Sequence, residues 1–350
     1  MKSVKIGEHE VGLDQPAYII AEAGANHDRD FAIACNLIDV AADCGADAVK
    51  FQTYSAETLY SRFTPRLKMM DDFDRSPPGE TPFELIKRVE LPREWQEKLW
   101  DHAVERGIDF LSTPYDLKAV EELAILGVKA FKIGSFEIVY YGLLRAAAQY
   151  QRPLIISTGN SNLADVERAL KVVREEGNDQ VVLLHCVSQY PAQFEDQNLR
   201  AMQTLTQAFD VPVGFSDHSM GYTAAVVALG LGSCCFEKHF TLDRERSGPD
   251  HPSALEPDEL GSFIKAIRDA EKALGSPVKR VQPSEEEVHR LGRRSLHALV
   301  HIPKGVTITA NMITVKRPAL GVHPAHEGIV VGRTAQRDIQ ADEWITWDMV

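Results

Sequence analysis

Two histidines stand at the ends of consecutive strand-like runs of this sequence. His218 follows the run 213–216, and His239 closes the run 234–239. On neighbouring strands their imidazoles could reach one cation, an arrangement suited to Mn²⁺, Fe²⁺, Zn²⁺ or another borderline metal. The alternative is two unrelated histidines, one of them bonded to a carbonyl, and spacing alone leaves both interpretations open. Further ligands or hydrogen-bond partners could come from Glu22, His27, His185 and Asp217.

Two lysines favour phosphate chemistry. Lys50 and Lys132 end strand-like runs, and hydroxyls follow at Ser135, Ser157 and Ser188. Two ammonium groups with several hydroxyls can hold a phosphate ester in a site of low dielectric. The alternative, lysines that extend their tips into water, is weakened by the apolar residues on either side of each lysine.

Polar residues end all eight strand-like runs. One such residue would be a polar cap on a strand, but eight together indicate a common site. The full set is Glu22, Lys50 with Gln52, Ser112 with Thr113, Lys132 with Ser135 and Glu137, Ser157 with Thr158, Ser188 with Tyr190, Asp217 with His218, and Glu237 with Lys238 and His239.

The runs that must position these residues alternate with amphipathic segments of helix length from residue 17 to about 275. Eight strands, each followed by a helix, over about 250 residues predict a (β/α)8 TIM barrel of class α/β. A doubly wound sheet is the alternative, but the first turn, 22–27, lacks a GxGxxG motif. The predicted strands are 18–21, 48–52, 109–112, 130–133, 154–157, 181–186, 213–216 and 234–239.

Three segments lie outside this repeat. A strand pair near 4–11 is expected to close the bottom of the barrel, and the insertion 54–90 is expected to form an active-site loop. We predict a catalytic domain over 1–275, a polar linker over 276–291 and a small β-rich domain over 292–350.

Composition limits the function classes. The net charge of −13 argues against a nucleic-acid or anionic-membrane surface, and no stretch is long and apolar enough to span a bilayer. The start lacks the layout of a signal peptide, and the five cysteines, odd in number and without CxxC spacing, are typical of reduced thiols. We therefore expect a cytoplasmic protein that binds neither nucleic acid nor membrane.

Several segments together resemble the sialic acid synthase family, which includes legionaminic and pseudaminic acid synthases. The resemblance covers nearly the whole chain, up to Val315-Lys316-Arg317-Pro318. Its motifs are residues 19–27 (IIAEAGANH), 45–52 (GADAVKFQ), 131–135 (FKIGS), 156–159 (ISTG), 184–186 (LHC), 190–191 (YP), 214–218 (GFSDH), 237–240 (EKHF) and 248–250 (GPD).

The resemblance implies a TIM barrel followed by an antifreeze-like (SAF) domain, in a domain-swapped homodimer. It implies that His218 and His239 bind a divalent metal, Mn²⁺ first and Mg²⁺ or Co²⁺ as alternatives. Ser188 and Ala319 depart from the usual residues. The implied catalytic residues are Glu22, Lys50, Lys132 and Glu137, and the implied substrate-binding residues are Gln52, Thr113, Ser135, Ser157, Ser188, Tyr190, Asp250 and Arg317.

The implied reaction joins C3 of phosphoenolpyruvate to the aldehyde of an open-chain N-acyl amino sugar, N-acetylmannosamine first, and releases phosphate. The product is N-acetylneuraminate or a related nonulosonic acid, with legionaminic or pseudaminic acid as alternatives. Two other classes stay open: another TIM-barrel aldolase or condensing enzyme, and a non-catalytic carbohydrate-binding protein. The lysine and histidine pairs fit a Schiff-base aldolase less well, because that enzyme needs a single lysine of lowered pKa.

Overall fold

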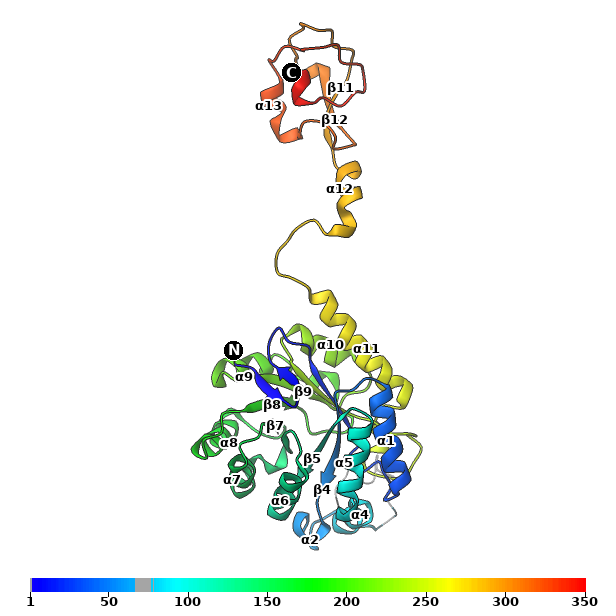
Figure 1. Cartoon of the computed structure of the whole chain (residues 1–350), viewed down its shortest axis with the longest axis vertical. Helices are drawn as coiled ribbons and strands as arrows, with labels where there is room; N and C mark the ends of the chain where they lie inside the picture. Colours follow the sequence, from blue (N-terminus) through cyan, green and yellow to red (C-terminus); the bar gives the residue numbers. More distant parts are fainter. Residues whose placement is uncertain (1, 67–76, 78) are drawn as a thin grey trace. The chain divides into compact units, whose positions relative to one another are not determined.

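Eight parallel strands form the centre of the larger unit, residues 1–275, in a computed structural model that describes residues 2–66, 77 and 79–350 (Figure 1). Their order is β5-β4-β3-β10-β9-β8-β7-β6, and β5 also lies beside β6, so the sheet curves round on itself. The predicted α/β barrel is confirmed. The strands are β3 (Tyr18–Glu22), β4 (Ala48–Thr53), β5 (Asp109–Pro114), β6 (Phe131–Ile133), β7 (Leu154–Ser157), β8 (Val181–Cys186), β9 (Val213–Asp217) and β10 (Cys235–His239).

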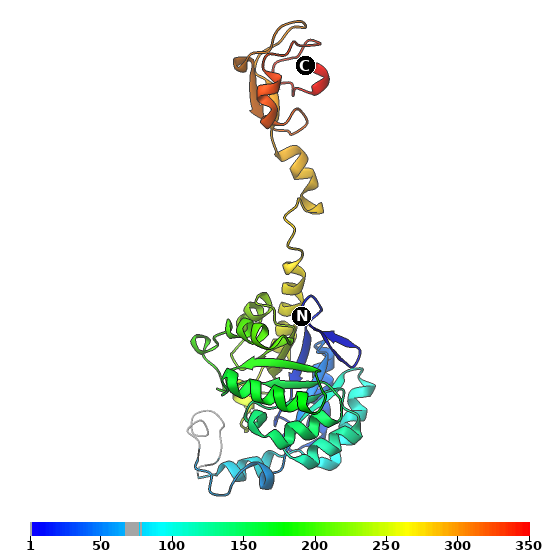
Figure 2. The same ribbon diagram turned by 90° about the vertical axis from the view of Figure 1, so that its left-hand side faces the viewer.

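Helices follow the strands and cover the outside of the sheet (Figure 2). Local sequence sets their ends: the Asp30 and Asn162 side chains cap the first turns of α1 and α8, and Gly127 ends α6 in the left-handed region at φ 89°. The helices are α1 (Phe31–Asp43), α5 (Gln96–Glu105), α6 (Leu117–Leu126), α7 (Tyr141–Gln149), α8 (Leu163–Glu175), α9 (Ala201–Phe209), α10 (Thr223–Gly230) and α11 (Pro257–Leu274).

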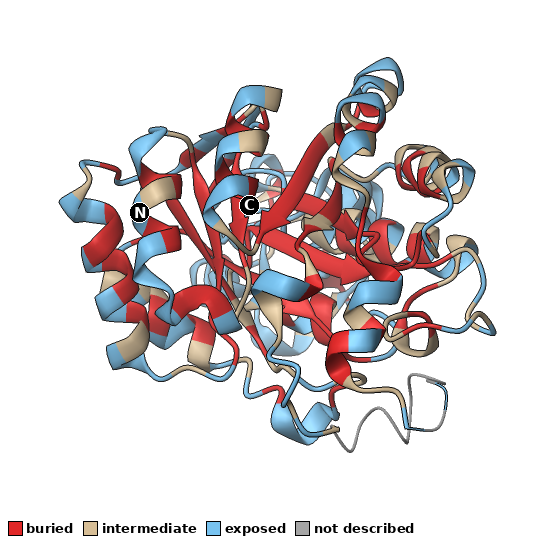
Figure 3. Ribbon diagram, turned by 90° about the horizontal axis from the view of Figure 1, so that it is seen from below, coloured by how far each residue is buried: buried red, intermediate tan, exposed pale blue. Residues whose placement is uncertain are grey.

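The main core fills the space between the sheet and these helices. Phe51, Phe131, Phe215 and Phe236 point outward from the strands and are fully buried. Each large apolar side chain buried in this way contributes about 1.5–3 kcal/mol. Figure 3 shows the result as buried strands enclosed by helices whose outer faces are exposed.

A hairpin closes one end of the barrel interior. β1 (Val4–Ile6) pairs antiparallel with β2 (His9–Val11), as the sequence predicts. Val4, Ile6 and Val11 are buried in one cluster with interior residues of the strands, among them Ile20 and Leu111. The inner core therefore begins at the hairpin and continues through the barrel toward the carboxyl ends of the strands.

The described residues of the insertion after β4 include the helices α2 (Ala56–Leu59) and α4 (Pro82–Val89). Thr81 and Glu84 form a capping box at the start of α4. The remainder of the predicted active-site loop, residues 67–76 and 78, lies outside the described residues.

The chain divides into two compact units, Met1–Gly275 and Ser276–Val350. In the second, α12 (Glu286–Gly292) covers the end of the predicted linker and extends one residue beyond it, and β11 (Ser295–Ala298) pairs antiparallel with β12 (Ile313–Lys316). A separate apolar cluster, which includes Leu296, Ile308 and Ile339, forms the core of this small domain, and α13 (Glu327–Val330) adds one helical turn.

The cysteines and the longest helices bear on the environment of the protein. All five cysteines are free thiols. Within the part of the chain that the structure describes, no helix is long and apolar enough to cross a membrane.

Candidate functional site

A polar layer lies directly above the apolar interior of the barrel. Alternate residues of a strand point to the same face, so an interior residue predicts that the residue two positions later is also interior. Ile20 is thus followed by Glu22, Ala48 by Lys50 and Cys235 by Glu237. The layer lines a cavity at the carboxyl ends of the strands: Glu22, Lys50, Gln52, Thr113, Tyr115, Lys132, Gly134, Ser135, Phe136, Glu137, Ser157, Ser188, Tyr190, Ser216, His218, Glu237 and His239.

Two buried lysines and two buried carboxylates form the centre of this layer. The Lys50 ammonium lies 2.6 Å from Glu22 Oε2 and 3.6 Å from Glu237 Oε2, and it donates to Thr113 Oγ1 at 3.1 Å. The Lys132 ammonium lies 3.2 Å from Glu237 Oε1. Glu237 therefore lies between both lysines, and the four charges balance when all are ionised.

Burial and pairing act in opposite directions on these groups. Burial alone would raise the pKa of Glu237, but the ammonium groups of Lys132 and Lys50 outweigh it and lower the pKa to about 2. Burial would lower the pKa of Lys50, but Glu22 and Glu237 raise it instead. For Glu22, burial prevails over Lys50 and His239, so its pKa is raised. Glu22 is the member of the cluster that is most easily protonated.

Hydroxyl groups gather on the side of the cavity next to Lys132. Ser135 Oγ accepts from the Gly159 amide at 3.1 Å and lies 3.2 Å from Cys186 Sγ. A side chain at position 159 would collide with Ser188 Oγ and come within 2.8 Å of Ser135 Oγ, so glycine leaves room for both hydroxyls. Among the described residues Ser188 Oγ is buried without a hydrogen-bond partner, and Ser157 is buried at the end of β7. Together these groups form a small polar cradle.

The two predicted metal-binding histidines lie beside each other. Their ring centroids are 5.6 Å apart, a distance that one cation can bridge at about 2.1 Å from each nitrogen. His218 Nδ1 lies 2.7 Å from the Val187 carbonyl, which fixes this ring and leaves Nε2 to face the site. Burial, followed by the neighbouring His239, lowers the pKa of His218 to about 3, so its imidazole is neutral, as a metal ligand must be.

This pair fits a cation with open positions for substrate and not a closed cage. Within the described ranges, no three His, Cys, Asp or Glu side chains converge closely enough to hold a metal by themselves. Among those residues His239 Nδ1 makes no hydrogen bond, although the Asp250 carboxylate is 3.7 Å away. Two neighbouring imidazoles beside a carboxylate suit a divalent ion.

Three of the other suggested ligands have different partners. His27 Nδ1 accepts from the Arg29 amide, and His185 Nε2 lies 2.7 Å from the Gln197 carbonyl. Asp217 is 3.0 Å from the buried ammonium of Lys238. Asp217 and Lys238 point outward because each is one residue out of phase with the interior positions, so this ion pair lies on the outer side of the sheet.

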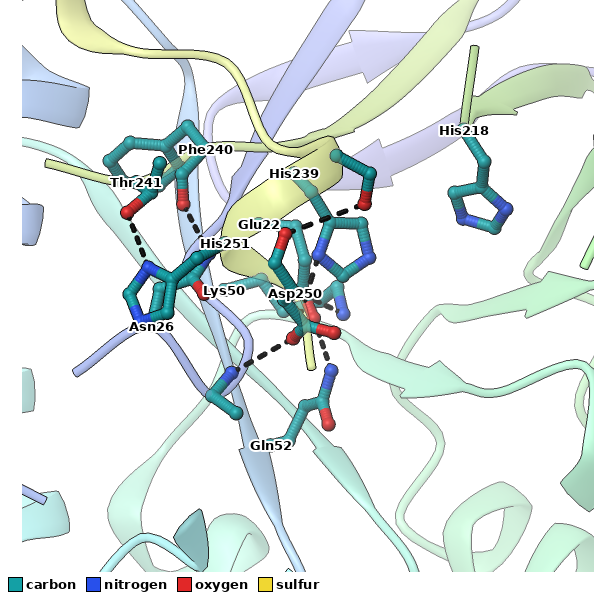
Figure 4. Close-up of polar contacts among 12 residues, drawn as sticks. Glu22, Asn26, Lys50, Gln52, His218, His239, Phe240, Thr241, Asp250 and His251 are labelled. Carbon is teal, nitrogen blue, oxygen red and sulfur yellow. Dashed lines mark hydrogen bonds and ion pairs between the residues drawn. The ribbon is translucent and has the colours of Figure 1, made fainter. Parts of the chain in front are cut away.

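The opposite side of the cavity carries groups suited to a polyhydroxylated ligand. Gln52 donates to Glu22 Oε1 at 2.7 Å, and Asp250 lies against His239 (Figure 4). The Tyr190 ring packs against His218 at 4.2 Å between centroids and meets the His239 ring edge-on at 5.6 Å. Tyr190 thus forms a wall beside both histidines.

Glu137 lines the cavity from a turn of 3-10 helix after β6. Burial raises its pKa to about 7. Its Oε2 finds no hydrogen-bond partner in the described part of the chain, and Gly134 is needed beside it because a side chain there would collide with this oxygen. Such a carboxyl can give or accept a proton at neutral pH.

The barrel unit brings together twelve predicted site residues around the cavity, with Asp250 beside His239. Arg317 is the exception: it is exposed and belongs to the second unit. Sequence reasoning placed Glu237 at a strand end but did not select it. The signal was present, because Glu237 precedes His239 by two residues and must share its face.

Comparisons with known proteins find similarity along nearly the whole chain. The NeuB family matches residues 37–279, and the SAF domain matches residues 293–350. N,N'-diacetyllegionaminic acid synthase of Legionella pneumophila is 38% identical over 343 residues, which cover 97% of this chain and 96% of that protein. N-acetylneuraminate-9-phosphate synthase of Homo sapiens is 34% identical over 97% of this chain and 94% of its own length. The crystal structure of N-acetylneuraminic acid synthetase from Leptospira borgpetersenii is 34% identical, covers 82% of this chain and 94% of that one, and has a TM-score of 0.72.

Proposed function

The chain belongs to the NeuB family of sialic acid synthases, and we propose that it condenses phosphoenolpyruvate with an N-acyl amino sugar to give a nonulosonic acid and phosphate. The observation that carries this proposal is the buried cluster in which Lys50 and Lys132 share Glu237 beside the paired histidines. A cluster that is neutral by itself can accept an anionic substrate together with a divalent cation.

Phosphoenolpyruvate binds to the lysine side of the cavity. Lys50 and Lys132 offset its negative charge, and the hydroxyls of Ser135, Ser157 and Ser188 donate to its oxygens. Ser188 stands where sialic acid synthases can have Asn, but its hydroxyl, which has no hydrogen-bond partner among the described residues, can still donate. Because these groups lie at or just beyond the ends of neighbouring strands, they can hold C3 of the substrate in one position.

The amino sugar binds between the histidines, Tyr190 and Asp250, with Gln52 close by. A divalent ion held by His218 and His239, Mn²⁺ first and Mg²⁺ or Co²⁺ as alternatives, would polarise the aldehyde as a Lewis acid. Asp250 and Tyr190 orient the sugar so that its aldehyde carbon faces the enol carbon.

Proton transfer falls to Glu22 and Glu137. Burial already raises the pKa of Glu22, and the negative charge of bound phosphoenolpyruvate raises it further, so Glu22 carries a proton to the aldehyde oxygen. Carbon–carbon bond formation leaves positive charge at C2, where water adds before phosphate departs by C–O cleavage. Glu137, with its pKa of about 7, accepts the proton of that water.

The identity of the amino sugar has several candidates. N-acetylmannosamine is the first candidate, and the 38% identity to the Legionella pneumophila enzyme favours the diacetamido-trideoxyhexose precursor of legionaminic acid as the second. Purified protein with phosphoenolpyruvate and Mn²⁺ should release phosphate with one of these sugars, with N-acetylmannosamine 6-phosphate or with the pseudaminic acid precursor. Phosphate release and product mass are the measurements. No release with any of the four, or borohydride trapping of a lysine adduct, would favour another class of enzyme.

We also propose that the active unit is a domain-swapped homodimer. Apolar side chains stand exposed on loops that follow the strands around the cavity, among them Phe136, Tyr140, Phe194 and Tyr222. Such a surface favours a protein contact. A second copy can supply Arg317, whose guanidinium can donate to the N-acyl oxygen of the sugar.

Mixing two inactive variants tests the shared site. Arg317→Ala lacks the arginine and His218→Ala lacks a metal ligand, so a heterodimer contains one complete site. Activity should return when subunits exchange, as followed by mass spectrometry of the dimers. Exchange without recovery would mean that Arg317 serves its own barrel or none.

A further inference from the structure

A fully buried histidine joins two loops beside the candidate site. The ring of His251, in the 3-10 turn His251–Ser253, uses both of its nitrogens. Nε2 lies 2.9 Å from Asp28 Oδ1, and Nδ1 lies 2.7 Å from Thr241 Oγ1 (Figure 4 shows the second contact). Asp28 follows β3 and Thr241 follows β10, so the ring ties together segments more than two hundred positions apart.

The hydrogen bonds fix the orientation of this ring. Burial alone would raise the pKa of Asp28, but His251 and then Arg246, which forms an ion pair with it, outweigh burial and lower the pKa. Asp28 is therefore an acceptor, and His251 Nε2 carries the hydrogen. A flipped ring would place carbon atoms against both partners, so the contacts select one orientation.

The adjacent residue, Asp250, is the site carboxylate. Its Oδ2 accepts from the Ala25 amide at 3.1 Å and lies 3.7 Å from His239 Nδ1. Two glycines allow these approaches. A side chain at Gly24 would collide with Asp250 Oδ2, and one at Gly248 would come within 2.8 Å of the His251 ring.

We propose that His251 is a positioning residue, which with Asp28 and Thr241 holds the Asp250 carboxylate against His239 and the sugar. This inference rests on the proposed function of Asp250 in sugar binding. His251 itself does not touch the cavity: it acts through the backbone it shares with Asp250. A displacement of about 1 Å at a reacting site can cost on the order of 100-fold in rate, so a loosened carboxylate has a large kinetic effect.

Thr241→Val tests this role with little change in volume, and Thr241→Ser is the matched control that keeps the hydroxyl. With N-acetylmannosamine, or the sugar that gives the fastest phosphate release, kcat/KM for the sugar should fall roughly 10- to 100-fold in the valine variant. The KM for phosphoenolpyruvate should stay within about twofold, because its ligands lie elsewhere in the cavity. The serine variant should remain near wild type. Equal losses for both substrates would indicate general damage and overturn the proposal.

A double-mutant cycle with Asp250→Asn separates the proposed role of Asp250 in sugar binding from the positioning of Asp250 by His251. The contacts of His251 with Asp28 and Thr241 are called the clamp here. If the clamp acts through Asp250, adding Thr241→Val to Asp250→Asn lowers kcat/KM for the sugar little further, whereas two independent losses of kcat/KM multiply. If Asp250→Asn leaves the sugar kinetics unchanged, the proposed role of Asp250 fails. If the cycle is additive while Asp250→Asn is impaired, the clamp fails alone. If Thr241→Val does not fold, Asp28→Asn weakens the contact at His251 Nε2 instead. Its kcat/KM for the sugar, alone and combined with Asp250→Asn, is judged by the same criteria.

Discussion

Replacing Glu237 by Gln would remove the carboxylate that lies between the two lysines while keeping the shape of the side chain. In the wild-type protein its two oxygens lie 3.2 Å from the Lys132 ammonium and 3.6 Å from that of Lys50, and one also accepts from Ser216 Oγ at 3.1 Å. Lys50 would keep Glu22 as a partner. Lys132 would lose its carboxylate, so an uncompensated charge would remain buried.

The size of the effect follows from the pKa. The value of about 2 for Glu237, against 4.5 for an ordinary glutamate, corresponds to about 3 kcal/mol in favour of the charged form in the folded protein. Breaking a buried ion pair by removing one partner costs about 3–5 kcal/mol. We therefore expect the free energy of unfolding to fall by about 3 kcal/mol.

Urea unfolding of the full chain, followed by far-UV circular dichroism, measures this loss. Glu175→Gln is a matched control, because Glu175 pairs with Arg145 at 2.8 Å on the surface, where an ion pair contributes at most about 1 kcal/mol. Adding Lys132→Met to Glu237→Gln should restore part of the stability by removing the unpaired charge. A Glu237→Gln protein within about 0.5 kcal/mol of wild type would refute this reasoning.

Three further predictions concern metal, phosphate and pH. Excess EDTA should abolish turnover and Mn²⁺ should restore it, and His239→Ala should weaken Mn²⁺ binding in calorimetry; full activity in EDTA would contradict the metal proposal. Lys50→Met removes a charge-assisted contact of about 1.5–3 kcal/mol, so steady-state kinetics should show at least a tenfold loss in apparent affinity for phosphoenolpyruvate or in rate; an effect confined to the sugar's KM would be inconsistent with this assignment. Burial raises the pKa of Glu137 to about 7, so the folded state holds this proton more tightly than the unfolded state and stability falls as pH rises from about 4.5 to about 7. Glu137→Gln should remove that fall, on the order of 2–3 kcal/mol, in urea unfolding at about pH 5 and about pH 8; an unchanged pH dependence would mean that Glu137 titrates normally.

Most of the barrel could be predicted because each strand is a short apolar run bounded by clear helix signals. Interior positions were harder, since runs buried on both faces show no alternation between apolar and polar residues. The register of β10 with its neighbouring strands is needed to show that Glu237 points inward and Lys238 outward. Once Cys235 is known to be interior, both orientations follow.

Other features of the site depend on contacts that no local pattern encodes. The link from Asp28 to His251 joins residues 223 positions apart, and neither residue belongs to a helix or strand pattern that would bring them together. The neutral state of His218 likewise depends on burial among residues from other strands. Sequence predicts which residues end the strands, and tertiary packing decides which of them share a proton, a cation or a carboxylate.

The hairpin β1–β2 has a practical consequence for attaching this enzyme to a solid support. It packs against the inner core at the amino ends of the strands, whereas the cavity opens at their carboxyl ends. An anchor introduced at the exposed Glu8, in the turn between β1 and β2, would point away from the catalytic mouth. A bead or electrode coupled to a cysteine introduced at this position would leave the cavity of the barrel open to both substrates.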